Sequence, residues 1–209
     1  MKFIFPEKPE RIFDINTVPD NYFFQVKKDG HRCEIIISDN GVEIFNRYGK
    51  PLNAIKNDNW EWLKNIFPSN TILDGEVVGA RQKGEVNDTI VVWDCPFFDN
   101  KDLTNSSYIE RYDELKKYSN QNILELNNKK VFGTTFIGAN NNLKIYLSSN
   151  FDKKEYYKYW KSLDGYFDEG LVFKNPKAKL AWNYRAGKTS VNQLKKLLTD
   201  EKGRNILTN

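Results

Sequence analysis

Residues 27–32 read Lys-Lys-Asp-Gly-His-Arg, and this stretch decides how the rest of the chain is interpreted. Residues 22–27 are rich in aromatic side chains, which predicts a strand leading into it. Residues 31–38 alternate toward an apolar run, which predicts a second strand leading out. On its own, Lys-Asp-Gly is ordinary turn chemistry and predicts a charged hairpin tip.

The spacing of the two lysines separates them in space. Successive side chains of a strand point to opposite faces, so Gln25, Lys27 and Asp29 share one face and Lys28 lies on the other. Only one of the two amines can therefore face a given pocket. The one histidine, His31, is expected at the surface.

The residues that follow predict a hairpin and then short strands and helices. Asp39-Asn40-Gly41 separates two apolar runs, and Asn-Gly tolerates the positive φ that a hairpin turn needs. Without a regular βαβ repeat, the order of the elements predicts an α+β fold with largely antiparallel sheets. Helices are expected at residues 57–67, 108–118 and 152–163, and further strands at 71–78, 89–93, 131–138 and 170–174.

The composition excludes several classes of protein. The chain has 209 residues, of which 39% are hydrophobic and 14% aromatic, which excludes a disordered or collagen-like chain. That length suits one domain with its own core. The net charge of +4 permits a polyanionic partner without requiring one.

Membrane and secretion signals are missing from the sequence. No apolar run approaches the roughly 20 residues that span a bilayer, and the first residues lack a signal-peptide pattern. Cys33 and Cys95 form no CxxC pair and are expected to be buried apolar side chains. These features predict a cytoplasmic, monomeric protein with no membrane partner.

Five further motifs follow residues 27–32, and their order is informative. They are Asn46-Arg47-Tyr48-Gly49-Lys50-Pro51, Leu73-Asp74-Gly75-Glu76-Val77-Val78, Val92-Trp93-Asp94, Ile109-Glu110-Arg111 with Leu115, and Glu169-Gly170-Leu171-Val172-Phe173-Lys174. With K-x-D-G-x-R at residues 27–32, the ordered set resembles the motifs of the covalent nucleotidyltransferases: ATP-dependent DNA ligases, RNA ligases and mRNA capping enzymes. Each motif is weak singly, whereas the ordered set is specific.

The resemblance implies a fold and a reaction. It implies an ATP-grasp-like nucleotidyltransferase domain of two largely antiparallel sheets flanked by helices. It also implies that Lys27 attacks the α-phosphate of ATP to form lysyl-AMP, with Asp29 and Arg32 as further catalytic residues. The phrases LDGEVV and EGLVFK favour a DNA ligase, which passes AMP to a 5′-phosphate for nick sealing. Asp29 keeps two interpretations, a turn-capping side chain and a group for the joining step.

A lysine acts as a nucleophile only when its amine is neutral. Because its pKa in water is about 10.4, the amine must be desolvated or placed near other cations. Arg32, Arg47 and Lys174 are expected to supply that field and to hold phosphate oxygens. The residues expected to bind ATP are Gln25, Lys27, Arg32, Arg47, Glu76, Trp93, Lys174 and Lys195.

Base recognition and metal binding are expected from four of the motif residues. The resemblance implies that Trp93 stacks on the purine, although its spacing alone favours a core aromatic. Gln25 stands where DNA ligases often carry Glu, and its carbonyl can accept a hydrogen bond from the adenine amino group. Phosphoryl transfer also needs a hard cation, and Glu76 and Glu169 are the expected Mg²⁺ ligands.

The C-terminal residues depart from the family pattern. The family shows Lys-x-Lys after the Glu-Gly motif, whereas this chain has Lys195-Lys196 without the gap. Residues 190–193 form a capping-box pattern, and the leucines after them repeat at helical spacing. These features favour a helix over a strand there, with Lys195 as the expected phosphate ligand.

The resemblance also bears on domains and partners. Ligases carry an oligonucleotide-binding barrel after this domain, and the residues after Leu198 are too few for one. Residues 1–209 are therefore expected to form a single adenylation domain without the barrel, which a separate protein could supply. The expected partner is a nicked DNA duplex, or RNA. An RNA ligase, a capping enzyme that uses GTP, and a degenerate nucleotide- or nucleic-acid-binding module remain alternatives.

Overall fold

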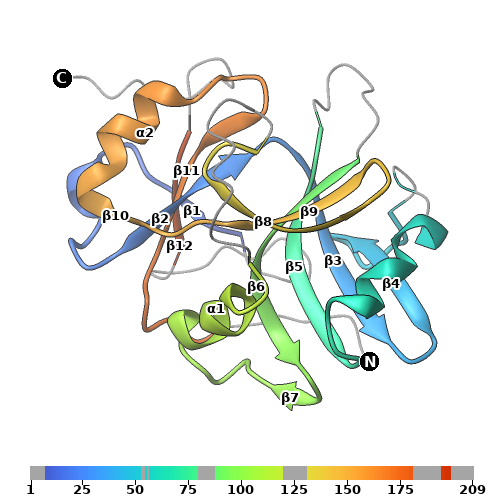
Figure 1. Ribbon diagram of the computed structural model, residues 1–209. Coiled ribbons are helices and arrows are strands. Elements are labelled where there is room, and N and C mark those ends of the chain that lie inside the picture. Colours follow the sequence, from blue (N-terminus) through green and yellow to red (C-terminus); the bar gives the residue numbers. More distant parts are fainter. Residues whose placement is uncertain are drawn as a thin grey trace.

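The structure is a computed structural model, and it describes residues 8–52, 55, 57–79, 88–119, 131–180 and 194–198 (Figure 1). Over these residues the strands form two sheets, called here the small sheet and the large sheet. The strands of the small sheet are β1 (Glu10–Arg11), β2 (Phe23–Lys28), β10 (Phe151–Asp152), β11 (Asp168–Lys174) and β12 (Leu194–Leu198). Their spatial order is β1-β12-β11-β2-β10.

The large sheet holds the other described strands. They are β3 (Gly30–Ser38), β4 (Gly41–Asn46), β5 (Thr71–Val78), β6 (Thr89–Phe98), β7 (Lys101–Asp102), β8 (Thr134–Asn140) and β9 (Leu143–Ser148). Their order is β4-β3-β5-β6-β9-β8, and β7 pairs with β6. Except for β1 with β12 and β6 with β9, the described pairings are antiparallel.

Short helices flank the sheets. The described helices are η1 (Ile15–Thr17), η2 (Asn57–Asn65), α1 (Tyr108–Lys116), η4 (Lys153–Glu155) and α2 (Tyr156–Ser162). Helix α1 begins at a capping box in which the backbone N–H of Ser107 donates to Glu110. None of the helices in the described ranges has the length and apolar character needed to cross a membrane. The α+β fold of two largely antiparallel sheets flanked by helices is confirmed.

The chain crosses from the small sheet to the large sheet at Asp29. β2 ends at Lys28 and β3 begins at Gly30, so only one residue separates strands of different sheets. The backbone N–H of Asp29 donates to the carbonyl of Phe167 at 2.7 Å, just before β11. Its carbonyl accepts from Gly79 N–H at 3.2 Å, just after β5. Residues 27–32 are therefore a link between two sheets, and the hairpin-tip interpretation is wrong.

Gly30 is required at this crossing because of its neighbours. A Cβ added there would lie 2.0 Å from the carbonyl oxygen of Val77, on the adjacent strand β5. That separation is far below a van der Waals contact, and the obstacle is backbone, which cannot turn away as a side chain can. The glycine therefore permits β3 to leave the crossing already paired with β5.

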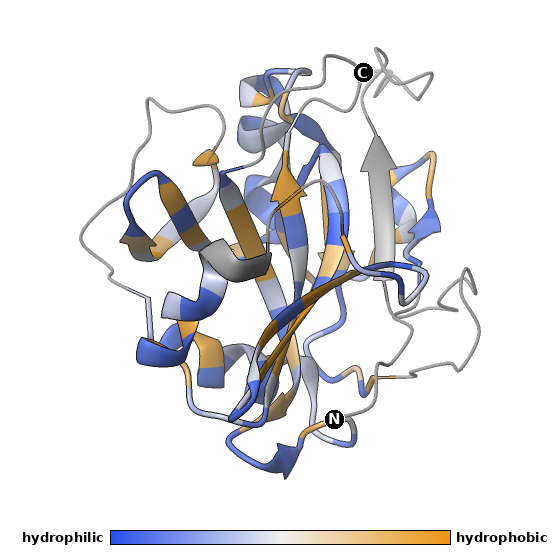
Figure 2. Ribbon diagram, turned by 90° about the vertical axis from the view of Figure 1, so that its right-hand side faces the viewer, coloured by the Kyte–Doolittle hydropathy of each residue, from blue (hydrophilic) through white to orange (hydrophobic). Residues whose placement is uncertain are grey.

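Buried apolar side chains form clusters against the large sheet and a separate cluster against the small sheet. Figure 2 shows hydrophobic and hydrophilic bands alternating along the strands, as expected for strands with two different faces. The largest cluster packs η2 and α1 against the large sheet, with Trp60, Leu63 and Leu115 fully buried. In the small sheet, Phe24 and Phe173 pack against partly buried aromatic residues of α2. Each sheet is thus covered by helix on one side.

The elements predicted before residue 175 agree with the observed ones apart from their ends and their helix type, but strand β9 was not predicted. The hairpin at Asp39-Asn40-Gly41 joins β3 to β4, and Gly41 has the positive φ expected, 139°. The expected helix at 57–67 is the 3₁₀ helix η2, and the strand expected from residue 131 begins at Thr134. His31 is half-buried in β3 rather than a surface residue, because both neighbouring strands pair with β3 there or nearby.

The expected C-terminal helix is wrong for Leu194–Leu198. These residues form β12, which pairs with β11 on one side and with β1 on the other. Two ladders of backbone hydrogen bonds outweigh a weak helical pattern, because tertiary pairing overrides intrinsic propensity. The capping-box residues 190–193 lie outside the described part of the chain.

We predict that Gly30→Ala destabilises the protein by about 3 kcal/mol or more, since the new methyl group must displace the β5 backbone. The matched control is Gly138→Ala on β8. There the added carbon meets side chains and no backbone: Ile66 Cδ1 at 2.5 Å, a flexible end that can move aside, and Trp62 Cζ3 at 3.4 Å. Urea unfolding of both variants measures the difference. Equal midpoints for the two variants would contradict the role given to Gly30.

Candidate active site

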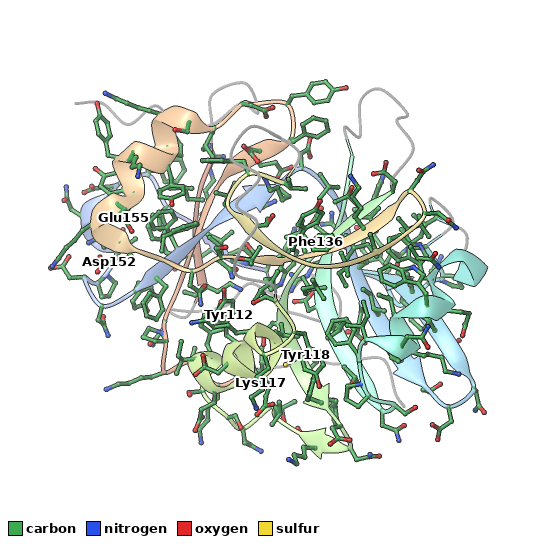
Figure 3. All side chains as sticks on the ribbon, in the orientation of Figure 1. Tyr112, Lys117, Tyr118, Phe136, Asp152 and Glu155 are labelled. Atoms are coloured by element: carbon green, nitrogen blue, oxygen red, sulfur yellow. The ribbon has the colours of Figure 1, made fainter. Side chains whose placement is uncertain are left out.

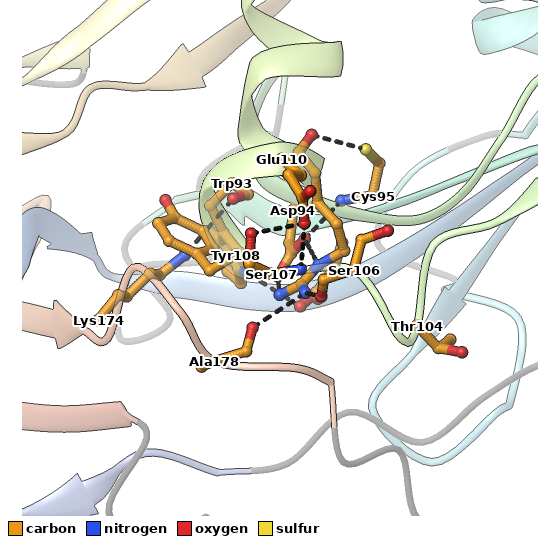
Figure 4. Close-up of polar contacts among 12 residues, drawn as sticks. Trp93, Asp94, Cys95, Thr104, Ser106, Ser107, Tyr108, Glu110, Lys174 and Ala178 are labelled. Carbon is orange, nitrogen blue, oxygen red and sulfur yellow. Dashed lines mark hydrogen bonds and ion pairs between the residues drawn. The ribbon is translucent and has the colours of Figure 1, made fainter.

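The two sheets meet where Lys174 of β11 reaches the large sheet. The Lys174 Nζ lies 3.4 Å from the backbone carbonyl oxygen of Trp93 on β6. It also lies 4.5 Å from the ring centroid of Tyr108, the first residue of α1. Figure 4 shows this lysine beside Tyr108 and Trp93. The Lys174 amine of the small sheet therefore contacts both the large sheet and α1.

Lys27 forms an ion pair with Glu169. β2 and β11 run antiparallel, with Lys27 opposite Gly170, and this register brings the amine to the Glu169 carboxylate. The side chain of Lys27 keeps 21% of its surface exposed, and that of Glu169 keeps 10%. The first and the last of the predicted motifs thus meet across one strand pair, with an amine that solvent can still reach.

Lys28 forms a separate ion pair with Asp168, and this pair is closed to solvent. Its Nζ lies 2.7 Å from Asp168 Oδ1, and the two side chains are 1% and 0% exposed. Burial lowers the pKa of Lys28 and raises that of Asp168, because desolvation penalises both charges more than the pairing favours them. As strand alternation predicts, the two lysines face different surroundings.

A second group of site residues lies on the large sheet around Asp74. Arg32 donates to both carboxylate oxygens of Asp74, through Nε at 3.0 Å and Nη2 at 2.6 Å. Trp93 donates its indole N–H to the same carboxylate at 2.8 Å. Burial opposes the charge of Arg32, but Asp74 beside it raises the pKa of the guanidinium overall. Asp74 thereby fixes both predicted ATP-binding residues.

Trp93 lies in a polar setting and not in an apolar core. It is half-buried, and its ring centroid lies 5.6 Å from the Arg32 guanidinium and 5.9 Å from the Lys174 amine. Cations over an indole face are favourable because the ring carries a negative face. The core interpretation of Trp93 is therefore wrong for its position.

Three further predicted site residues, Glu76, Asp29 and Arg47, lie outside the two ion pairs made by Lys27 and Arg32. Glu76 is buried on β5, with its Cα opposite that of Arg32. Asp29 is 2% exposed, at the residue that separates β2 from β3. Arg47 follows β4, and its guanidinium lies 5.7 Å from the Tyr48 ring centroid. Among the described residues, Arg47 forms no hydrogen bond or ion pair with the other predicted site residues.

The lysines of β12 are described by their backbone only. Lys195 lies opposite Phe173, and Lys196 lies opposite Val172. Val172 in turn lies opposite Gln25 on β2, whereas Phe173 lies opposite Phe24 of the apolar cluster. By register, position 196 rather than 195 therefore shares its face of the small sheet with Gln25.

Gln25 takes part in a hydrogen-bond network that the sequence did not predict. Its Nε2 donates to the hydroxyl of Tyr108 at 3.0 Å and to the carbonyl of Ser148 at 2.9 Å. The Tyr108 hydroxyl donates in turn to Asn150 Oδ1 at 2.7 Å. Tyr112, labelled in Figure 3, donates to the same Ser148 carbonyl at 3.1 Å. Helix α1 thus supports the strand that carries Lys27.

A buried ion pair holds α1 in place. Arg111 donates to both oxygens of Asp94, through Nε at 2.7 Å and Nη2 at 2.9 Å. Its Nη1 donates to the carbonyls of Ser106 and Ala178 at 2.6 and 3.2 Å (Figure 4). The motif residues Asp94 and Arg111 therefore position the helix that presents Tyr108.

Burial lowers the pKa of Lys174 from 10.5 to about 7. Desolvation is the main cause; Asp94 and Asp74 oppose it, and Arg111 and Arg32 add to it. The charge of Lys174 therefore changes near neutral pH. Burial also raises the pKa of both thiols, Cys33 and Cys95, well above 9.0, in keeping with buried apolar side chains.

The two predicted metal ligands are carboxylates, and they lie on different sheets. No cluster of three or more metal-ligating side chains occurs in the ranges that the structure describes. Mg²⁺ is usually held by one or two carboxylates together with substrate phosphates. Glu76 and Glu169, one on each sheet, match that donor set in number and chemistry.

Comparison with known proteins agrees with this arrangement. Residues 9–89 match the family model described as "ATP dependent DNA ligase domain". The DNA ligase of Vaccinia virus (strain Ankara) is 27% identical over 176 residues, covering 73% of this chain. The DNA ligase of Methanococcus aeolicus is 27% identical over 178 residues, covering 74%. This chain is similar to the ATP-dependent DNA ligases. These matches agree with the resemblance given by the ordered motifs.

Solved ligase structures share the fold. The Chlorella virus DNA ligase-adenylate superposes with a TM-score of 0.60 at 18% identity, covering 92% of this chain and 66% of that one. The ligase domain of M. tuberculosis LigD gives a TM-score of 0.58 at 14% identity, covering 95% and 61%. The chain spans about a third of the length of the curated ligases, 31% and 29% for the two named above.

We predict that Lys174 makes folding stability depend on pH. Between about pH 7 and 10.5 the unfolded chain protonates Lys174 while the folded chain keeps it neutral. Unfolding free energy should therefore rise with pH across that window, by up to about 1.4 kcal/mol per unit. Lys174→Met should lose this rise, whereas Lys101→Met, at an exposed residue of β7, should keep it. Urea titrations from pH 6 to 9.5 measure this; parallel curves for wild type and Lys174→Met would contradict it.

Proposed function

We propose that this chain is the adenylation domain of an ATP-dependent DNA ligase. In the proposed reaction the Lys27 amine attacks the α-phosphorus of ATP, a P–N bond forms, and pyrophosphate leaves. AMP then passes to the 5′-phosphate of a nicked duplex. The observation that carries the proposal is the contrast between the two lysines: Lys27 is partly exposed beside Glu169, whereas Lys28 is sealed against Asp168.

The surroundings of Lys27 suit this role. Glu169 orients the amine before nucleotide binds. Arg32 is a cation on the large sheet, and Lys174, on the strand next to β2, can bind a proton near neutral pH. The same cations are suited to hold phosphate oxygens as charge develops in the transition state. Arg47 and a lysine of β12, Lys195 or Lys196, complete the proposed phosphate contacts.

Base recognition is assigned to Gln25 and Trp93. Both N–H groups of the Gln25 amide are occupied, by Tyr108 and Ser148. The amide oxygen is the remaining polar atom, and it can accept a hydrogen bond from the amino group of adenine. The indole of Trp93, held by Asp74, offers a stacking face for the purine. An acceptor facing the base favours ATP over GTP.

Mg²⁺ would be held by Glu76 and Glu169 together with phosphate oxygens, and it would neutralise the charge of the leaving pyrophosphate. Asp29, buried at the crossing, is assigned to the joining step. The proposed substrate is a nicked DNA duplex, and the +4 net charge is compatible with binding it. The proposal covers one adenylation domain, with the protein acting as a monomer in the cytoplasm.

We predict that incubation with ATP and Mg²⁺ places AMP on Lys27 and that Lys27→Ala abolishes the adduct. Lys101→Ala, at an exposed residue of β7, is the control and should keep it. Intact-protein mass spectrometry followed by peptide mapping measures both. Sealing of matched nicked DNA and RNA duplexes then identifies the polynucleotide. An adduct that survives in Lys27→Ala, or that maps to Lys28, would overturn the assignment.

A further inference from the structure

The orientation of the Gln25 amide is set by two acceptors together, a backbone carbonyl and a tyrosine hydroxyl. A carbonyl oxygen can only accept hydrogen bonds, so the atom of Gln25 that lies 2.9 Å from Ser148 O is Nε2. The second N–H of Nε2 then donates to the Tyr108 hydroxyl at 3.0 Å. Turning the amide by half a rotation would place Oε1 against the Ser148 carbonyl, where two acceptors repel each other.

The direction of the remaining hydrogen bonds follows from this anchor. The Tyr108 hydroxyl accepts from Gln25, so its single proton is donated to Asn150 Oδ1 at 2.7 Å. Burial raises the pKa of Tyr108 well above 10.0, so the phenol keeps that proton. Asn150 Nδ2 is left buried with no hydrogen-bond partner among the described residues. Every hydrogen bond of the network therefore has a fixed donor and acceptor, although Asn150 Nδ2 stays without an acceptor among the described residues.

We propose that Tyr108 is a positioning residue for base selection: by holding the Gln25 amide, it makes the site select a purine that carries an amino group at position 6. The proposal rests on the proposed function, in which a nucleotide base lies against Gln25. A 6-amino group donates to the fixed Oε1. A 6-oxo group faces it with a second acceptor, and a buried pair of facing acceptors costs free energy.

The selectivity depends on the amide being held from two sides. A glutamine that is free to turn can offer either its oxygen or its nitrogen, and it then accepts both 6-amino and 6-oxo purines. Ser148 and Tyr108 each supply one acceptor for Nε2. The ion pair of Arg111 with Asp94 holds α1, and so holds Tyr108 against β2. The preference for one base is thus set by α1, a helix that packs against β6 of the large sheet.

Tyr108→Phe isolates the hydroxyl from the rest of the side chain. The aromatic ring stays, so the contact with the Lys174 amine 4.5 Å from its centroid is kept. Tyr112→Phe is the matched control. Tyr112 lies one turn further along α1 and also donates to Ser148 O, but it has no hydrogen bond with Gln25.

The experiment compares the dissociation constants of AMP and IMP by titration calorimetry. These nucleotides differ at position 6 of the base, and neither has a pyrophosphate to lose, so no covalent step intervenes. Wild type and Tyr112→Phe should bind AMP at least about tenfold more tightly than IMP. Tyr108→Phe should reduce that ratio by about five- to tenfold, as expected for one lost hydrogen bond. In a Gln25→Leu background, Tyr108→Phe should leave the ratio unchanged.

Several results would overturn the inference. They are wild-type binding that does not favour AMP, a Tyr108→Phe ratio equal to that of wild type, an equal loss in Tyr112→Phe, and an undiminished effect of Tyr108→Phe in the Gln25→Leu background. The covalent proposal fails separately. A protein that selects AMP through Tyr108 but forms no adduct on Lys27 keeps this inference and loses the proposed function.

Discussion

The site depends on the backbone of Asp29, which is bonded to both sheets at once. Its N–H donates to Phe167 before β11, and its carbonyl accepts from Gly79 after β5. A single residue therefore fixes the position of the segment before β11, in the small sheet, relative to the end of β5, in the large sheet. Gly30 makes this possible, because any side chain there would meet the Val77 carbonyl. Lys27 and Arg32, five residues apart in sequence, consequently lie on different sheets.

Most charged side chains of the site form ion pairs, and these pairs differ in their exposure to solvent. Arg111 with Asp94 and Lys28 with Asp168 are closed to solvent, and each binds one element to another. Buried pairs of this kind add little net stability, but breaking one leaves an uncompensated charge. Lys27 with Glu169 is partly open to solvent, as is Arg32 with Asp74. Lys174 lies in a desolvated position, which lowers its pKa to about 7.

The sequence predicted the fold class and the resemblance to ligases because both depend on local sequence patterns. The Asn-Gly turn, the apolar runs and the ordered motifs each lie within a few neighbouring residues. The sequence did not predict the partners of Gln25, since Tyr108 and Ser148 are 83 and 123 residues away. The Lys28–Asp168 pair was missed because a lysine in a turn motif looks exposed. β12 was misread as a helix, since its pattern fits one and only its strand partners decide otherwise.

The most direct test of the account is a crystal structure of the protein after incubation with ATP and Mg²⁺. The account predicts continuous density from Lys27 Nζ to the phosphorus of AMP, with the base against Trp93 and within hydrogen-bond distance of Gln25 Oε1. Glu169 should have left its ion pair with Lys27. A nucleotide bound elsewhere, or Lys27 still paired with Glu169 while nucleotide occupies the space between the sheets, would contradict it.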